Sequence, residues 1–157
     1  MDSPDSILSS SPEETFALGE KIGAGLVGGE VVLLTGSLGA GKTLLTKGIL
    51  NAVDYDIDEV TSPSFALVNL YRAPRFDVYH IDLWRAGTGP SAAFAVGLDE
   101  ILEDESAVVI IEWADHLLGY HFERPAISIA IAGDGEESRR IEIRCEMRNA
   151  DCGMRIS

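Results

Sequence analysis

The fold of this chain is decided by one stretch, Gly36-Ser37-Leu38-Gly39-Ala40-Gly41-Lys42-Thr43. The stretch matches the phosphate-binding pattern G-x-x-x-x-G-K-S/T in full. In such a loop, glycines let backbone N–H groups turn toward phosphate oxygens, Lys42 reaches the β- and γ-phosphates, and the Thr43 hydroxyl binds Mg²⁺. We therefore expect a nucleotide-binding loop from Gly36 to Thr43, with Leu44 beside it at the start of the following helix.

The segments on either side of the loop are those that the motif requires. Residues 30–34, Glu-Val-Val-Leu-Leu, form an apolar run typical of a buried parallel strand. After the loop, apolar residues recur with helical spacing from Leu44 to about Val53. A glycine-rich turn before an ordinary helix is the alternative. The order of strand, loop and helix favours the nucleotide-binding interpretation.

The rest of the chain predicts a mixed α/β domain. Ser11-Pro12-Glu13-Glu14 has the form of a helix capping box, and Gly28-Gly29 ends the helical pattern that follows it. Further strands are expected over residues 64–71, 77–84, 107–111, 127–131 and 140–145, with one or two short helices over 92–102. The first two of these strands look like an antiparallel excursion, and the last two like a closing hairpin.

Size and charge restrict the class of protein. At 157 residues the chain fits one domain, which we place at residues 11–147, between a flexible N-terminal tail at 1–10 and a C-terminal tail at 148–157. There are 12 basic and 26 acidic residues, a net charge of -14, so the surface repels polyanions. Strong direct binding of nucleic acid or of an anionic membrane is therefore disfavoured. A triphosphate is still acceptable, because the loop and a divalent cation make the local field positive.

The remaining composition indicates a cytoplasmic protein. Cys145 and Cys152 show neither CxxC spacing nor neighbouring histidines, so we expect reduced thiols rather than a disulfide framework or a zinc site. The start of the chain is acidic and rich in serine, unlike a signal peptide. No segment approaches the roughly 20 apolar residues of a membrane span.

Two carboxylates are candidates for the acid that a P-loop enzyme needs at the end of a neighbouring strand. Glu112 follows the apolar run Val108-Val109-Ile110-Ile111, which makes it the better Walker B residue and, with Thr43, the expected metal ligand. Asp82 follows Val78-Tyr79-His80-Ile81 and lies inside a more mixed strand. Either acid could instead have a structural role, and Asp82 in particular could cap a helix or pair with Arg85.

Three other features are weaker candidates. Ser62 and Ser64, in the segment Thr61 to Phe65, could sense the γ-phosphate, although Ser-Pro-Ser is more often a turn before a strand. Trp113 could lie near the nucleotide or simply pack at a strand end. His80 is expected to be a packed strand histidine rather than a base.

The choice of nucleotide rests on elimination. The Asn-Lys-x-Asp segment that usually gives P-loop GTPases their guanine specificity does not occur in the sequence, so ATP or ADP with Mg²⁺ is preferred. A small-molecule kinase would need an acceptor pocket and usually an arginine-bearing lid, and the arginines at 72, 75 and 85 are too scattered to argue for one. A binding module that senses nucleotide without turnover is the third alternative.

The motifs together resemble the TsaE (YjeE) family of bacterial P-loop ATPases, which are required for threonylcarbamoyladenosine modification of tRNA at position 37. The resemblance spans roughly residues 11–145. It rests on GSLGAGKT (36–43), SPSFALVNLY (62–71), HIDLWR (80–85), GLDE (97–100) and IEWAD (111–115), in the order and spacing of the family. Two departures, Ser64 in place of threonine and Trp84 in place of tyrosine, keep the hydroxyl and the aromatic ring.

The resemblance implies a three-layer α/β fold with Mg-ATP at the P-loop. It implies that Thr43 and Glu112 surround the metal, that Asp82 is an acid needed for hydrolysis, and that Ser62 to Phe65 is a switch. It also brings Ser11 and Gly135 near the nucleotide. The family acts with the threonylcarbamoyl transferase TsaD and with TsaB, so we expect an ATPase that is slow alone and stimulated by these partners.

Overall fold

The computed structural model describes residues 5–36, 41–61, 63, 66–133 and 138–146. Its strands are β1 (Asp5–Ser9), β2 (Val31–Gly36), β3 (Val68–Arg72), β4 (Asp77–Asp82), β5 (Val108–Glu112), β6 (Ala126–Ala132) and β7 (Arg139–Glu146). Its α-helices are α1 (Pro12–Ala24), α2 (Lys42–Ala52), α3 (Pro90–Val96) and α4 (Leu98–Ile101), and two 3₁₀ turns are η1 (Ile57–Glu59) and η2 (Ala114–Leu117).

The described strands form one seven-stranded sheet in the order β1-β7-β6-β2-β5-β4-β3. Its centre is parallel, because β2 pairs with both β5 and β6 and β4 pairs with β5 in that sense. Its flanks are antiparallel, through β3–β4 on one side and β6–β7 and β1–β7 on the other. The expected mixed sheet, with its antiparallel excursion and its C-terminal hairpin, is therefore confirmed.

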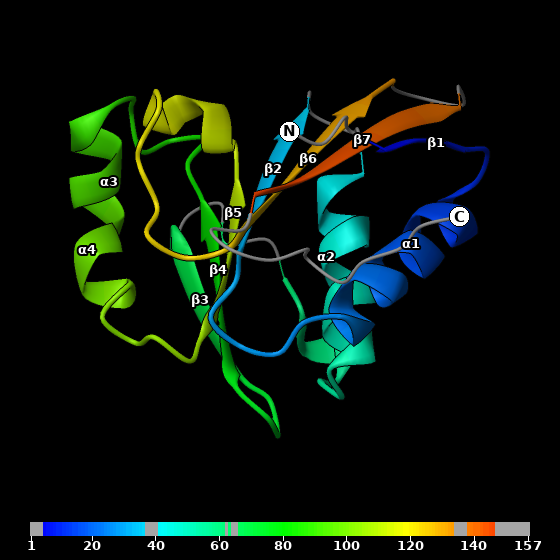
Figure 1. The fold of residues 1–157 in the computed structure, drawn as a ribbon, viewed down its shortest axis with the longest axis horizontal. Coiled ribbons are helices and arrows are strands. Elements are labelled where there is room, and N and C mark those ends of the chain that lie inside the picture. Colours follow the sequence, from blue (N-terminus) through cyan, green and yellow to red (C-terminus); the bar gives the residue numbers. More distant parts are fainter. Residues whose placement is uncertain (1–4, 37–40, 62, 64–65, 134–137, 147–157) are drawn as a thin grey trace.

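Helices cover the two faces of the sheet, as Figure 1 shows, with α1 and α2 on one side and α3 and α4 on the other. Side chains alternate between the faces along each strand. Val108 and Ile110 of β5 thus join the core under α1 and α2, whereas Val109 and Ile111 join the core under α3 and α4. The three-layer arrangement is confirmed, and the continuous apolar run of β5 is explained by burial on both faces.

Two glycines bring α1 and α2 into close contact on their face of the sheet. A Cβ atom at Gly19 would lie 2.3 Å from the carbonyl oxygen of Leu45, and one at Gly48 would lie 2.2 Å from that of Phe16. Neither backbone can move away cheaply, so only glycine fits at these crossings. The contact fixes α2, and with it the start of the helix that follows the P-loop.

The N-terminal segment differs from the expectation. Residues 1–10 were predicted to form a flexible tail, yet Asp5–Ser9 is the edge strand β1, paired with β7 from Asp5↔Ile143 to Ser9↔Arg139. The strand is short and mostly exposed, so its partner and not its own hydrophobic pattern makes it a strand. The start of the next helix is as predicted, with Ser11 as the N-cap of α1.

Further expectations concern the two cysteines, the C-terminal segment and membrane-spanning helices. Cys145 in β7 is disulfide-bonded, so the expected reduced thiol is wrong there, because the spacing of cysteines in a sequence does not show which sulfur atoms approach each other. Cys152 and the predicted tail at 148–157 lie outside the described residues. Within the described part of the chain, none of the helices combines the length and apolarity that crossing a bilayer requires.

Candidate nucleotide site

The P-loop motif connects the end of β2 to the start of α2. Gly36 closes the strand at φ 147°, and Gly41 caps α2 in the left-handed region at φ 109°, a conformation that disfavours any residue with a side chain. Ser37, Leu38, Gly39 and Ala40 lie outside the described residues. The described flanks therefore have the strand-to-helix geometry that presents backbone N–H groups to an anion.

Lys42 lies at the first position of α2 and is buried. Its Nζ donates a hydrogen bond to the carbonyl oxygen of Gly36 at 2.7 Å and lies 4.3 Å from the ring centroid of Trp113. Burial lowers the pKa of the Lys42 ammonium from 10.5, and the nearby carboxylates of Glu112, Asp82 and Asp115 partly offset that effect. Lys42 is thus a partly desolvated cation with three carboxylates in its neighbourhood.

The first turn of α2 adds further donors at the same place. Thr43 and Leu44 follow Lys42 in this turn and are half-buried. The turn carries no acidic side chain, so nothing on the helix itself compensates the positive end of its dipole. Backbone N–H groups and the positive helix end together favour a phosphate group here.

Asp82 and Glu112 end neighbouring parallel strands and stand opposite each other in the register of β4 and β5. The same register places Glu112 beside Leu34 of β2, two residues before the P-loop begins. Both acids are buried, at 5% and 3% exposure. By alternation they share the face of Val78 and Ile110, which is the face covered by α2. The tertiary structure therefore brings both predicted acids beside Lys42.

Each of these carboxylates makes a hydrogen bond within the protein. The Oδ1 atom of Asp82 accepts a hydrogen bond from the backbone N–H of Trp84 at 2.9 Å. The Oε2 atom of Glu112 lies 2.6 Å from Nε2 of the fully buried His80. The hydrogen bond to His80 has no signal in the sequence, because it joins residues 32 positions apart.

Trp113 has an unusual backbone conformation directly after Glu112. It adopts φ 60° and ψ 41°, in the left-handed region that costs a bulky residue free energy. Its ring packs against Trp84, with centroids 4.4 Å apart, and against His116 at 5.6 Å. The strained turn thus presents the indole to the Lys42 ammonium. Strain of this kind is often found at functional sites.

A metal ion would find oxygen donors here but no complete protein cage. Within the described residues there is no group of three or more His, Cys, Asp or Glu side chains able to hold a metal ion by itself. Mg²⁺ usually takes one or two protein oxygens and completes its shell with phosphate and water. A hydroxyl from Thr43 and a carboxylate from Glu112 are hard oxygen donors, so the donor set fits Mg²⁺.

The remaining predicted site residues belong to the start of α1, to the predicted switch and to the late glycine-rich loop. Ser11 uses its hydroxyl to accept the backbone N–H of Glu14 at 3.1 Å, which caps α1. Ser62, Ser64, Phe65 and Gly135 lie outside the described residues. Thr61, at the start of the predicted switch, is held against β3 because its carbonyl oxygen accepts the Tyr71 hydroxyl at 2.9 Å and the Asn69 amide at 3.1 Å.

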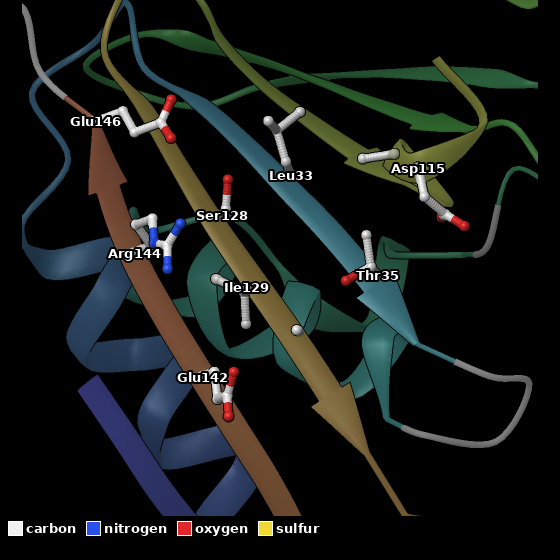
Figure 2. Close-up of a pocket in the computed structure, with 10 residues that line it drawn as sticks. Leu33, Thr35, Asp115, Ser128, Ile129, Glu142, Arg144 and Glu146 are labelled. Atoms are coloured by element: carbon white, nitrogen blue, oxygen red, sulfur yellow. The ribbon is translucent and has the colours of Figure 1, made fainter. Parts of the chain in front are cut away.

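A groove of about 330 Å³ lies on the opposite face of the sheet, over β2, β6 and β7 (Figure 2). Thr35 and Asp115 line one end, and Arg144 and Glu146 of β7 line another part of it. The groove is separate from the candidate nucleotide site, since Lys42, Asp82 and Glu112 do not line it. Its end at Thr35 nevertheless lies one residue before the P-loop.

Comparisons with known proteins agree on one family. The family model of the threonylcarbamoyl adenosine biosynthesis protein TsaE matches residues 9–141. The tRNA threonylcarbamoyladenosine biosynthesis protein TsaE of Mycobacterium tuberculosis H37Rv is 40% identical over 111 residues, which is 67% of this chain and 66% of that protein. The chain therefore matches slightly less than two thirds of this relative's length.

Two further comparisons cover more of the chain. The TsaE protein of Nostoc sp. PCC 7120 is 32% identical over 146 residues, 91% of this chain and 87% of that protein. The crystal structure of YdiB from Bacillus subtilis superposes with a TM-score of 0.71 at 29% identity, covering 95% of this chain and 89% of that one. Both the sequence and the fold are thus similar over nearly the whole chain.

Proposed function

The chain belongs to the TsaE family of threonylcarbamoyl adenosine biosynthesis proteins, and from that premise we propose that it is a Mg²⁺-dependent ATPase. It acts with TsaD and TsaB in the threonylcarbamoyladenosine modification of tRNA at position 37. Its place of action is the cytoplasm, and it hydrolyses ATP slowly until its protein partners are present.

The observation behind the proposal is that Lys42, Asp82 and Glu112, which lie far apart in the sequence, come near one another in the fold. Both acids lie close enough to Lys42 to raise its pKa against the effect of burial. A buried lysine facing two buried carboxylates is an unfavourable arrangement in the absence of another function. A polyphosphate with a divalent cation supplies both the anion and the cation that such a group of charges accepts.

The residues have separate roles in this proposal. Residues 36 to 44, including Gly36, Gly41 and Leu44, enclose the phosphates, and Lys42 binds the β- and γ-phosphates. Thr43 and Glu112 would hold Mg²⁺, which neutralises charge on the γ-phosphoryl group when it is bound. Asp82 accepts a hydrogen bond from the attacking water, so that ATP and water give ADP and inorganic phosphate.

The proposal also gives roles to residues at the periphery of the site. Trp113 borders the nucleotide, since its ring already contacts the Lys42 ammonium. Ser62 and Ser64 sense the γ-phosphate, and Ser11 and Gly135 approach the nucleotide from the N-terminal segment and the hairpin. These assignments come from the resemblance to the family and from position in the chain.

The net charge supports action through protein partners. A chain at -14 repels tRNA, so binding of tRNA is left to proteins that handle it. The identified relatives are named for threonylcarbamoyladenosine biosynthesis, which is a modification of tRNA. TsaD and TsaB would therefore make the contact with RNA, while this chain binds and hydrolyses ATP.

The test is a measurement of phosphate release by the full chain, alone and with TsaD and TsaB. We expect slow release from the chain alone and a marked increase with both partners. Lys42→Ala should abolish both rates, and Lys47→Ala, on the same helix outside the motif, is the matched control. Equal rates with and without the partners would overturn partner stimulation.

Two outcomes would replace the proposal by another function. Transfer of the γ-phosphate to a small molecule, seen as a phosphorylated metabolite in place of free phosphate, would establish a kinase. Tight binding of ATP and ADP without hydrolysis, even with TsaD and TsaB present, would establish a nucleotide-sensing module. Single-turnover measurements with labelled ATP separate these cases.

A further inference from the structure

We propose that His80 is a positioning residue, which fixes the carboxylate of Glu112 so that one of its oxygens stays available to the metal. This inference rests on the proposed function, since it gives Glu112 a role at the nucleotide. It assigns a purpose to the one fully buried histidine, which the sequence suggested to be only a packing residue.

The position of His80 follows from the parallel register. His80 lies opposite Ile110, and Asp82, two residues later, lies opposite Glu112. Residues two apart on a strand point to the same face, so His80, Asp82 and Glu112 all lie on the α2 face of the sheet. His80 is therefore one step deeper in the core than the two acids, directly behind the Glu112 carboxylate.

The bond between the two side chains fixes the state of the imidazole ring. An ionised carboxylate only accepts hydrogen bonds, so Nε2 of His80 must carry the proton that is shared with Oε2 of Glu112 at 2.6 Å. Nδ1 is buried and has no hydrogen-bond partner among the residues that the structure describes. A neutral ring protonated on Nε2 leaves only an acceptor unpaired, whereas a proton on Nδ1 would be a buried N–H without an acceptor.

This arrangement does not fit a histidine that serves packing alone. A buried polar ring is costly unless its groups are paired, and His80 leaves one nitrogen unpaired while committing the other to Glu112. The hydrogen bond from His80 reaches the Glu112 side chain from a neighbouring strand, and both side chains are buried. The orientation of this carboxylate therefore depends on this imidazole.

The consequence concerns the oxygens of Glu112. Oε2 is engaged by His80, so the carboxylate cannot rotate without losing a buried hydrogen bond. Its second oxygen is left for the metal or a metal-bound water. A hydrogen bond from a neighbouring side chain to a metal ligand orients that ligand. Its loss typically lowers metal affinity or activity by about 10–100-fold.

The experiment compares His80→Phe and His80→Gln in the full chain. Phenylalanine fills the space without a donor, and glutamine restores an N–H near the position of Nε2. The control is His121→Gln, the same change at an exposed histidine away from Lys42. For each protein, calorimetry gives the affinity for ADP without Mg²⁺ and the Mg²⁺ concentration that half-saturates its effect on ADP binding.

We expect His80→Phe to raise that Mg²⁺ concentration by about 10-fold or more and to leave the Mg²⁺-free affinity for ADP unchanged. His80→Gln should restore most of the Mg²⁺ response. In a Glu112→Gln background, His80→Phe should have no further effect, because His80 acts through Glu112. A merely structural role would weaken ADP binding equally with and without Mg²⁺, and that result would overturn the proposal.

A second measurement keeps the proposal testable if His80→Phe does not fold. Nitrogen-15 spectra of the unmodified protein, with His80 identified by its loss in His80→Gln, report which ring nitrogen is protonated. A proton on Nε2 supports the proposal, and an Nε2 without a proton overturns it, because that nitrogen could not donate to Glu112. A parent protein that binds no nucleotide would overturn the proposed function, whereas normal Mg²⁺ dependence in His80→Phe would overturn this inference alone.

Discussion

Asp82 and Glu112 are register partners across the parallel strands β4 and β5. Parallel strands end at the same edge of the sheet, so residues at their C-terminal ends meet there although 30 positions separate them in the sequence. β2 ends at the same edge and leads to Lys42. This edge therefore collects two acids and a lysine at the start of one helix.

The first prediction concerns Asp82. Asp82→Asn keeps an oxygen that can accept the Trp84 N–H, so the fold should persist, but the neutral amide cannot activate water. ATP hydrolysis in the presence of TsaD and TsaB should fall by about 100-fold or more. Phosphate release measures the rate, and circular dichroism checks the fold. Asp77→Asn, on the same strand in a surface ion pair with Arg72, should leave the rate unchanged; an unaltered rate in Asp82→Asn would remove this acid from the mechanism.

The second prediction concerns the pKa of Lys42 and the stability of the protein. Burial lowers this pKa, so between the lowered value and 10.5 the unfolded chain binds more protons than the folded chain. Stability therefore rises with pH in that window, and at neutral pH the charged lysine is a net cost. Lys42→Met should raise the free energy of unfolding at neutral pH. It should also abolish the contribution of Lys42 to the increase of stability with pH.

Urea denaturation from pH 7 to pH 10.5 measures the effect. Lys47→Met, on the same helix, is the control for the general effect of removing a positive charge from an acidic protein. A Lys42→Met protein that is less stable at pH 7, with an unchanged pH dependence, would mean that attraction to the three carboxylates exceeds the cost of burial.

The third prediction tests the contact between α1 and α2. Alanine favours a helix over glycine by about 1 kcal/mol, but a Cβ atom at Gly48 would lie 2.2 Å from the backbone oxygen of Phe16. The clash should outweigh the helix preference, so Gly48→Ala is expected to destabilise the protein by about 2 kcal/mol. Thermal unfolding measures the loss, and Lys47→Ala is the neighbouring control. A higher melting temperature in Gly48→Ala would show that the helices separate at little cost.

The fourth prediction separates two roles of Ser11. Its hydroxyl caps α1, so Ser11→Ala should lower the free energy of unfolding by about 1 kcal/mol, and Ser11→Asp should retain most of the stability. The family resemblance also brings Ser11 near the nucleotide. If that is correct, Ser11→Ala weakens ATP binding measured by calorimetry at a temperature where the variant is folded. Unchanged affinity would leave Ser11 with capping alone.

Local sequence patterns predicted helices and strands well where short-range interactions or hydrophobicity alone determine them. The capping box at Ser11 starts α1, and the hydroxyl accepts the expected N–H of Glu14. The apolar run before Glu112 forms the fully buried strand β5. In both cases the deciding interactions are local or depend on hydrophobicity alone. β1 could not be predicted in the same way, because an exposed edge strand is defined by its partner.

For the site, motifs and strand-end patterns identified good candidate residues but not the contacts between them. Glu112, Asp82 and Lys42 were selected from motif and strand-end patterns, and the structure places both acids close enough to influence the lysine. The bond from His80 to Glu112 and the contact from Trp113 to Lys42 were not predictable, since each joins separate segments. The left-handed conformation of Trp113 likewise has no signal in its residue type.

The P-loop motif, the order of most elements, the net negative charge and the resemblance to the family could be recognised without a structure, because motif, hydrophobic periodicity and net charge are properties of the chain read in order. The tertiary structure alone decided which charges meet. The parallel register of β4 and β5 sets Asp82 beside Glu112 and His80 behind it. Pairing of this kind depends on how distant strands align and on the cost of burying an unpaired charge, and neither is a property of any single segment.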